Sequence, residues 1–265
     1  MADAAYSFRP EERAFVSRCE DWLFQAQDRP ILTYFLNPHE RDVLRALAAR
    51  ASLTFFESAG EEYKRVLVSP SFYRVDDADF ELLLLEVSYN AKFKQLTHVQ
   101  ILGTFLGETG VRREEIGDIL VSGGTAQIYV SRRLVSAFEQ QITRIARLPV
   151  SLQELPLNGA LSASNGSFSV RADSTQKIIL ASSLRLDKII AAALTISRNF
   201  AGNMIQSEQV KVNYTLADKN DALLKTGDLI SIRGYGRIKI GAVLGQTKKQ
   251  KFKLEISLMM NQKKR

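Results

Sequence analysis

The chain has 265 residues, enough for two or three small domains, and 45% of them are hydrophobic, as in ordinary globular proteins. One cysteine and two histidines exclude a disulfide framework and any metal site built from clustered cysteines or histidines. No apolar run reaches the roughly 18 residues that a membrane helix needs, and the first residues lack the pattern of a secretion signal. We therefore expect a cytoplasmic protein without a metal or other cofactor.

The positive charge of the chain is concentrated near its end. The formal net charge of +7 combines −1 over residues 1–75, −3 over residues 76–160 and +11 over residues 161–265. Such an asymmetry favours a polyanionic partner, either nucleic acid or an anionic membrane surface. A basic, solvated domain with a frayed tail is the other interpretation, and charge alone leaves both open.

Residues 1–75 predict a small N-terminal α/β domain. Apolar side chains recur at helical spacing between residues 15 and 26, and again between residues 44 and 51 after the helix-start pair Asn37-Pro38. Two short runs, 53–56 and 65–68, are typical of strands. Cys19 lies on the apolar face of the first helix, so we expect a buried, unreactive thiol.

Residues 76–155 predict a central ferredoxin-like domain, the fold of RRM modules. Helices are expected at 96–107 and 131–147, and strands at 80–89, 116–121, 126–130 and 149–152, with a hairpin turn at 122–125. The resulting order is β-α-β-β-α-β. Shared fold does not establish shared function, however.

This central block lacks the usual marks of an RNA-reading sheet. Its strands offer Tyr89 and Tyr129 but not the aromatic pattern with which RRM sheets stack bases. Its net charge is also negative. We therefore favour a positioning or protein-contact role, while two arginine pairs remain candidates for local phosphate contacts or for solvated surface: Arg112-Arg113 and Arg132-Arg133.

Residues 156–182 are expected to form a linker with short strands. Pro156 and the pairs Asn158-Gly159 and Asn165-Gly166 are turn signals, and residues 168–171 and 178–180 have the composition of short extended pieces.

Residues 183–265 predict two short helices followed by small strands. Leu186 begins one apolar helical face, and Ser197 is a natural N-cap for the second helix. Asp187 suits the first turn of its helix. Arg185 and Arg198 fall near the two helix starts, where backbone N–H groups and cationic side chains converge on phosphates.

This stretch resembles the S4 RNA-binding domain over about residues 183–240. The resemblance rests on the segments LRLDKII (184–190), ISRNFA (196–201), VKVN (210–213) and LKTGD (224–228), followed by ISIRGYGR (230–237). In the turn before the VKVN strand the family usually has glycine, whereas Glu208 or Gln209 stands there in this chain. The resemblance implies a C-terminal S4 domain with a basic extension at 183–265, and hence an α+β protein of three small domains.

Four further segments resemble the bacterial YlmH family: YFLNPHE (34–40), LTHVQILG (96–103), RREEIGDIL (112–120) and GQTKK (245–249). The family usually has Arg at the position of His39 and Arg-Asp at the positions of Val99-Gln100. The resemblance implies a protein that binds rRNA and tRNA on large ribosomal subunits carrying peptidyl-tRNA, and we expect it to be non-catalytic and monomeric when free. It implies a role in ribosome-associated quality control, where alanine tails are added to stalled chains, and an older association with cell division.

The predicted RNA contacts lie at the two helix starts and on the strands and tail that follow. They are Arg185, Lys188, Ser197, Arg198, Asn199, Lys211, Asn213, Arg233, Arg237, Lys248, Lys249 and Lys251. One alternative is an RNA-modifying enzyme whose catalytic residues lie in the first 160 residues, since pseudouridine synthases often carry S4 domains. The triplet Arg185-Leu186-Asp187, which also occurs at their active site, is explained here by the S4 helix start. A second alternative is a division-site adaptor whose basic domain contacts membrane lipids.

Overall fold

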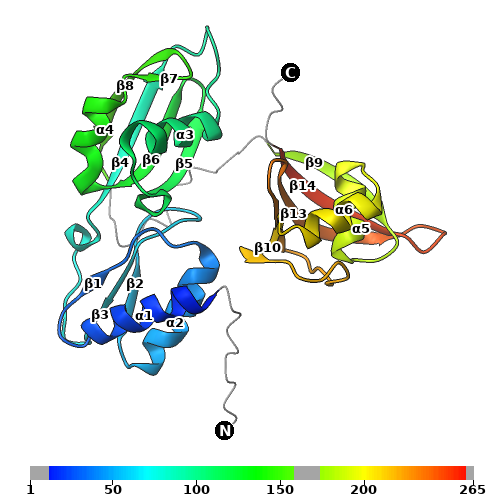
Figure 1. Ribbon diagram of the computed structural model, residues 1–265, viewed down its shortest axis with the longest axis horizontal. Helices are drawn as coiled ribbons and strands as arrows, with labels where there is room; N and C mark the ends of the chain where they lie inside the picture. The colour runs from blue at the N-terminus through cyan, green and yellow to red at the C-terminus, as the bar shows by residue number, and fades with distance from the viewer. Residues whose placement is uncertain (1–11, 158–173, 261–265) are drawn as a thin grey trace. The chain divides into compact units, whose positions relative to one another are not determined.

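The computed structural model describes residues 12–157 and 174–260 and has a mixed α/β architecture (Figure 1). The chain divides into two compact units, residues 1–170 and 171–265. The expected strand at 168–171 lies outside the described residues. Within the described ranges, no helix combines the length and apolar character that crossing a bilayer requires.

The first unit begins with two helices packed on a small antiparallel sheet. Their bounds are α1 (Arg13–Gln25), β1 (Ile31–Leu32), α2 (Pro38–Arg50), β2 (Thr54–Glu57) and β3 (Val66–Ser69). The strand order is β1-β3-β2. The side chains of Cys19, Leu44 and Val66 are buried in the shared core, which confirms the predicted helical faces.

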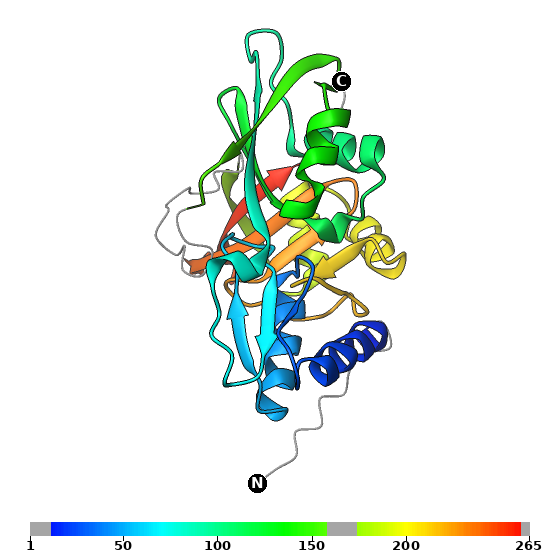
Figure 2. The same ribbon diagram turned by 90° about the vertical axis from the view of Figure 1, so that its left-hand side faces the viewer.

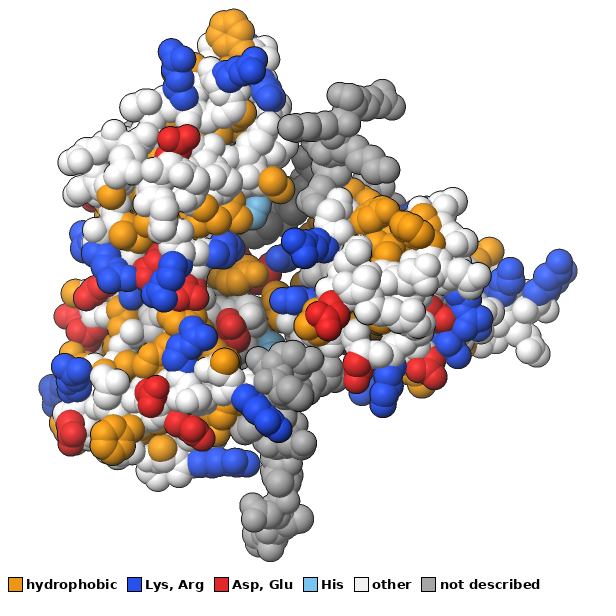
Figure 3. Space-filling model, in the orientation of Figure 1, with side chains coloured by type: hydrophobic (Ala, Val, Ile, Leu, Met, Phe, Trp, Pro, Cys, Tyr) orange, Lys and Arg blue, Asp and Glu red, His pale blue; other side chains and the backbone are white. Residues whose placement is uncertain are grey.

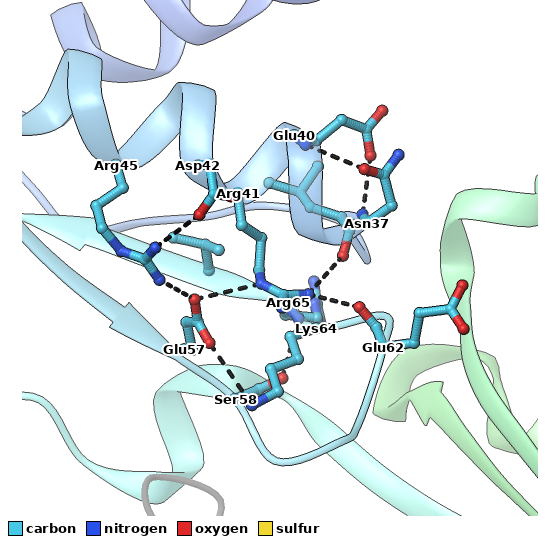
Figure 4. A network of polar contacts seen from close by, with 12 residues as sticks. Asn37, Glu40, Arg41, Asp42, Arg45, Glu57, Ser58, Glu62, Lys64 and Arg65 are labelled. Carbon is cyan, nitrogen blue, oxygen red and sulfur yellow. Dashed lines mark hydrogen bonds and ion pairs between the residues drawn. The ribbon is translucent and has the colours of Figure 1, made fainter. Parts of the chain in front are cut away.

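Polar side chains fix the position of α2 (Figure 4). The predicted cap is confirmed, since the Asn37 side chain accepts from the backbone N–H of Glu40, and the Glu40 side chain accepts from that of Asn37. Further along the helix, Arg41 pairs with Glu57 of β2 at 3.2 Å and donates 2.6 Å to the carbonyl of Glu62. The Glu57 carboxylate also pairs with Arg45. These contacts join the helix to the sheet and to the loop that follows.

The second half of the first unit is a five-stranded antiparallel sheet. Its strands are β4 (Leu82–Tyr89), β5 (Ile116–Ser122), β6 (Thr125–Ser131), β7 (Arg144–Ile145) and β8 (Leu148–Leu155), in the order β5-β6-β4-β8-β7. Helices α3 (His98–Thr109) and α4 (Val135–Gln141) lie on one side of these strands (Figure 2). Their Phe105 and Phe138 rings pack 5.0 Å apart over the buried sheet face. Short 3-10 turns occupy 77–80, 113–115 and 132–134.

The predicted helix over 131–147 is wrong at both ends. Only residues 135–141 are α-helical, after a 3-10 turn, and β7 follows directly. Ile142 and Ile145 are nevertheless buried as predicted. They reach the core from an extended segment, which ends at Ala146 and Arg147 in left-handed conformation, with φ of 48° and 72°.

The N-terminal elements and the central sheet pack directly on one another. The Asp118 carboxylate of β5 accepts three consecutive backbone N–H groups of the loop after β2, from Glu61 (2.6 Å), Glu62 (2.9 Å) and Tyr63 (3.0 Å). Burial raises the pKa of Asp118 while these hydrogen bonds oppose the rise. Beside it, Gly117 leaves room for the buried ring of Phe35.

The second unit is a six-stranded antiparallel sheet with two helices on one face. Its helices are α5 (Leu186–Leu194) and α6 (Arg198–Gln206). Its strands are β9 (Thr175–Ala181), β10 (Val210–Val212), β11 (Thr215–Leu216), β12 (Leu229–Ile232), β13 (Gly236–Gln246) and β14 (Phe252–Met260), in the order β11-β10-β12-β13-β14-β9. The predicted extended piece at 178–180 lies within β9, which completes this sheet by pairing with β14. The lysines expected in a tail instead lie in and beside a β-hairpin.

Candidate nucleic-acid interface

The starts of α5 and α6 are joined by one carboxylate. Asp187 accepts from Arg185 through two hydrogen bonds of 3.2 and 3.1 Å and from the Nε of Arg198 at 2.7 Å. The Asp187 side chain is only 5% exposed, whereas those of Arg185 and Arg198 are 32% and 53% exposed. Burial raises the pKa of Asp187, but the hydrogen bonds from the two guanidinium groups outweigh it, so that the pKa lies below the usual value.

This arrangement orients two cations toward solvent at the helix starts. One negative charge pairs with two positive ones, so the group keeps a net positive charge, and the half-buried Lys188 side chain of the first turn of α5 adds to it. The Nη groups of Arg198 make no hydrogen bond within the described residues, and they remain able to donate to a phosphate. We call Arg185, Asp187, Lys188 and Arg198 the helix-start cluster.

Two more predicted residues lie at the start of α6. Ser197 caps the helix as expected, because its Oγ accepts from the backbone N–H of Phe200 at 3.1 Å. Asn199 is exposed in the first turn. Apolar surface is also available nearby, since Phe200 is 46% exposed and Leu223, which bridges to Arg185 through the backbone, is 74% exposed. The start of α6 therefore combines cationic, polar and apolar surface.

Lys211 and Arg237 lie on a different surface of the same unit. They flank Ser231 in register across β10, β12 and β13. Their strand neighbours Val210, Ile230 and Ile238 point into the core beneath the helices, and successive side chains of a strand point to opposite faces. Lys211 and Arg237 consequently belong to the sheet face that the helices leave open, not to the helix-start cluster.

The side chain of Asn213 makes two hydrogen bonds within the protein. Its side-chain oxygen accepts from the backbone N–H of Leu229 at 2.9 Å, and its side-chain nitrogen donates to Asp228 at 2.9 Å. Its φ of 48° is left-handed, a conformation that asparagine tolerates better than most residues. Asn213 thus stabilises the turn after β10, and since the residue is exposed, the RNA contact expected of it stays a prediction.

The remaining predicted cations lie in turns. Arg233 is exposed in the turn between β12 and β13. The loop at 247–251 is closed by Thr247, which exchanges backbone and side-chain hydrogen bonds with Gln250 and Lys251. The exposed lysines of this loop are Lys248, Lys249 and Lys251. The predicted site residues therefore form a helix-start cluster, an open-face pair and two exposed turns.

The turn after α6 has the backbone conformation that the glycine expected from the S4 resemblance would adopt. Glu208 has a φ of +57°, the left-handed region in which glycine is favoured, and its backbone N–H donates to Ile205. Glu208, not Gln209, is therefore the residue at the position of the missing glycine. It keeps the turn closed at the cost of local strain.

Sequence reasoning missed three contributors. Asp187 was not predicted to connect Arg185 and Arg198, yet its carboxylate pairs with both. Lys239 and Lys253 are exposed on the open sheet face, where Lys239 lies two residues beyond Arg237 on β13. Alternation with the buried Ile238 and Ile240 is the signal that could have placed Lys239 there.

The two tyrosines of the central sheet point to opposite faces. Tyr89 packs on the helix side, and its hydroxyl accepts from the backbone N–H of Leu96 at 3.3 Å. Tyr129 is half-buried on the other face, against the cluster that contains Phe35. The rest of that second face offers Glu86, Gln127 and Gln153 in register, with no aromatic ring among them. This supports the expectation that the sheet does not stack bases.

The cysteine and the two histidines are the remaining side chains that could act as a nucleophile, a base or a metal ligand. Cys19 is fully buried, as predicted, and burial raises its pKa to about 12. His39 contacts Glu12 at 2.7 Å. His98 is exposed at the first position of α3. Within residues 12–157 and 174–260, no group of three histidine, cysteine or acidic side chains is placed to hold a metal ion.

Comparison with known proteins gives consistent matches. Residues 76–159 match the family described as "Putative RNA-binding domain in YlmH". The chain is 32% identical over 259 residues to the "Ribosome-associated protein quality control protein P2" of Bacillus subtilis, covering 96% of this chain and 98% of that protein. The structure of the "Cell division protein ylmH from Streptococcus pneumoniae" matches with a TM-score of 0.52 and 36% identity, over 58% of this chain and 96% of that one. The chain therefore belongs to the YlmH family.

Proposed function

We propose that this chain is a non-catalytic RNA-binding protein that docks on structured rRNA and tRNA. Its working site is a large ribosomal subunit carrying peptidyl-tRNA, in ribosome-associated quality control, where its binding supports alanine tailing. The name of the Bacillus subtilis relative and the RNA-binding description of the family support this role. The observation that carries it in the structure is the helix-start cluster, in which Asp187 holds two guanidinium groups toward solvent.

The proposal assigns a task to each part of the chain. Residues 183–265 act as an S4-type domain, with β9 completing its sheet, and take most of the electrostatic contact with RNA. Residues 76–155 form an RRM-like domain in which sheet order and element order match the ferredoxin-like pattern. Residues 1–75, packed against it, position the protein on its target. Asp187 has no catalytic part here, because its carboxylate is buried and already paired twice.

Salt-dependent binding tests this assignment. The double variant Arg185→Gln/Arg198→Gln removes two phosphate contacts. Each neutralised phosphate contributes about 0.7–0.9 to the slope of log affinity against log salt concentration, so this slope should fall by roughly 1.4–1.8. The assay is filter binding to a structured rRNA fragment across a salt series, with co-sedimentation on large subunits as a second measurement.

The matched control is Arg13→Gln/Arg50→Gln, which makes the same change in net charge at exposed positions of α1 and α2. It should leave slope and affinity close to those of the parent chain. Equal behaviour of the two double variants would refute the placement of the interface at the helix starts.

A further inference from the structure

Three connections meet at one end of the central sheet. Tyr89, the last residue of β4, pairs with Val150 near the start of β8, and its backbone N–H donates to Gly124 in the β5–β6 turn at 3.0 Å. The loop at 90–97, the turn at 123–124 and the β7–β8 turn at 146–147 therefore lie at the same edge. Residues far apart in sequence are gathered there.

This edge is basic although its domain is acidic overall. Its connections carry four exposed cations, and residues 90–98, 122–125 and 142–150 contain no Asp or Glu. The four are Lys92, Lys94, Arg144 and Arg147. Figure 3 shows basic side chains beside a protruding hydrophobic one at the top of the view, where Figure 1 places the loop between β4 and α3.

An aromatic ring stands between two of these cations. Phe93 is 79% exposed, and it lies in a loop that hydrogen bonds hold in place. Asn90 accepts from the backbone N–H groups of Lys92 (3.1 Å, through its side chain) and Phe93 (3.3 Å, through its carbonyl). The capping box of Thr97 then fixes the start of α3. A held, solvent-exposed ring flanked by lysines is the combination that stacks an unpaired base while its phosphates are neutralised.

We propose that Lys92, Phe93, Lys94, Arg144 and Arg147, the basic loop end, bind an unpaired RNA segment. A base stacks on Phe93, and the cations contact the adjoining phosphates. This inference rests on the proposed function and locates a second RNA contact outside the C-terminal unit. The open face of the central sheet offers no comparable ring, since Tyr129 is half-buried against the N-terminal elements.

The test uses the full chain and two RNA probes of equal length. One is a hairpin with 2-aminopurine in its unpaired loop, and the other is a fully paired duplex. Phe93→Ala should weaken hairpin binding about tenfold, within the range measured for loss of one base–aromatic stack, and should abolish the change in 2-aminopurine fluorescence. Duplex binding should stay unchanged, and Phe93→Trp should restore both hairpin signals. Arg144→Gln/Arg147→Gln should lower the salt slope for the hairpin.

The matched control is Phe72→Ala, because Phe72 is 77% exposed in another loop of the same unit. Equal hairpin affinities for the Phe93→Ala and Phe72→Ala variants would overturn the inference while leaving the proposed function intact. Binding to phosphatidylglycerol vesicles is measured in parallel. If Phe93→Ala weakens vesicle binding and leaves hairpin binding unchanged, the inference is overturned in favour of a membrane contact. Failure of the parent chain to bind either RNA would overturn the proposed function itself.

Discussion

The junction inside the first unit depends on Gly117, and replacing it with alanine should destabilise that unit. An added Cβ would lie 2.6 and 2.8 Å from two ring carbons of Phe35 and 3.0 Å from the Cβ of Tyr129. Carbon atoms normally pack at about 3.5–4.0 Å. Because Phe35 is 2% exposed, its ring cannot move into solvent. Overpacking of this kind costs about 1–3 kcal/mol, so we expect a loss of about 2 kcal/mol in the free energy of unfolding.

Urea denaturation measures this effect through the fluorescence of Trp22. The chain has one tryptophan, and it packs in α1 against Phe15 and Tyr34, so it reports on the first unit. With a slope of about 2 kcal/mol per molar urea, the midpoint should fall by about 1 M. Gly107→Ala is the control, since Gly107 is an exposed helical residue with nothing within 4 Å of an added Cβ. It should stabilise by about 0.5–1 kcal/mol. Midpoints that move in the same direction would refute this reading of the junction.

Three further outcomes are expected. Asp187→Asn should lower the free energy of unfolding by about 1–3 kcal/mol at neutral pH. Because the folded-state pKa of Asp187 is depressed, its contribution is present above the unfolded-state pKa of about 4 and is lost as pH falls; a difference that persists unchanged at pH 2 in denaturation curves would contradict this. Glu208→Gly should raise the thermal midpoint by relieving about 1 kcal/mol of left-handed strain, and a lower midpoint would contradict it. Cys19 should resist a thiol reagent in the folded chain and react once urea unfolds it, as a buried thiol with a pKa of about 12 requires; rapid labelling of the folded protein would count against burial.

Local signals predicted the regular elements well, and long-range contacts explain the misses. Asn37-Pro38 and Ser197 start helices as expected, because capping depends on residues a few positions apart. The segment after Phe138 was predicted to continue the helix, because Ile142 and Ile145 fit helical spacing. In the structure both side chains reach the core from an extended segment. The turn at 146–147 contains no glycine, proline or asparagine, so nothing in the sequence marked it.

The sequence predicted which residues belong to the candidate site better than it predicted how they are arranged. The cations at 185 and 198 were correctly placed near helix starts, but only the folded chain shows that Asp187 pairs with both. The sequence did not show that Asn213 also stabilises a turn, because its hydrogen-bond partner Asp228 is distant in sequence. Strand alternation places Lys211 on the open sheet face, away from the helix-start cluster. The sequence alone does not give the register of the sheet on which this depends.

The long hairpin of the second unit determines where its lysine loop lies. β13 pairs with β12 only as far as Lys239 and then continues with β14 to Gln246. At about 3.3 Å per residue, these last seven residues carry the lysine loop roughly 20 Å past Leu229, the first residue of β12. Because Phe252 at the base of this loop pairs with Ala181, four residues before Arg185, the loop lysines lie at the end of the sheet from which β9 leads to the helix starts.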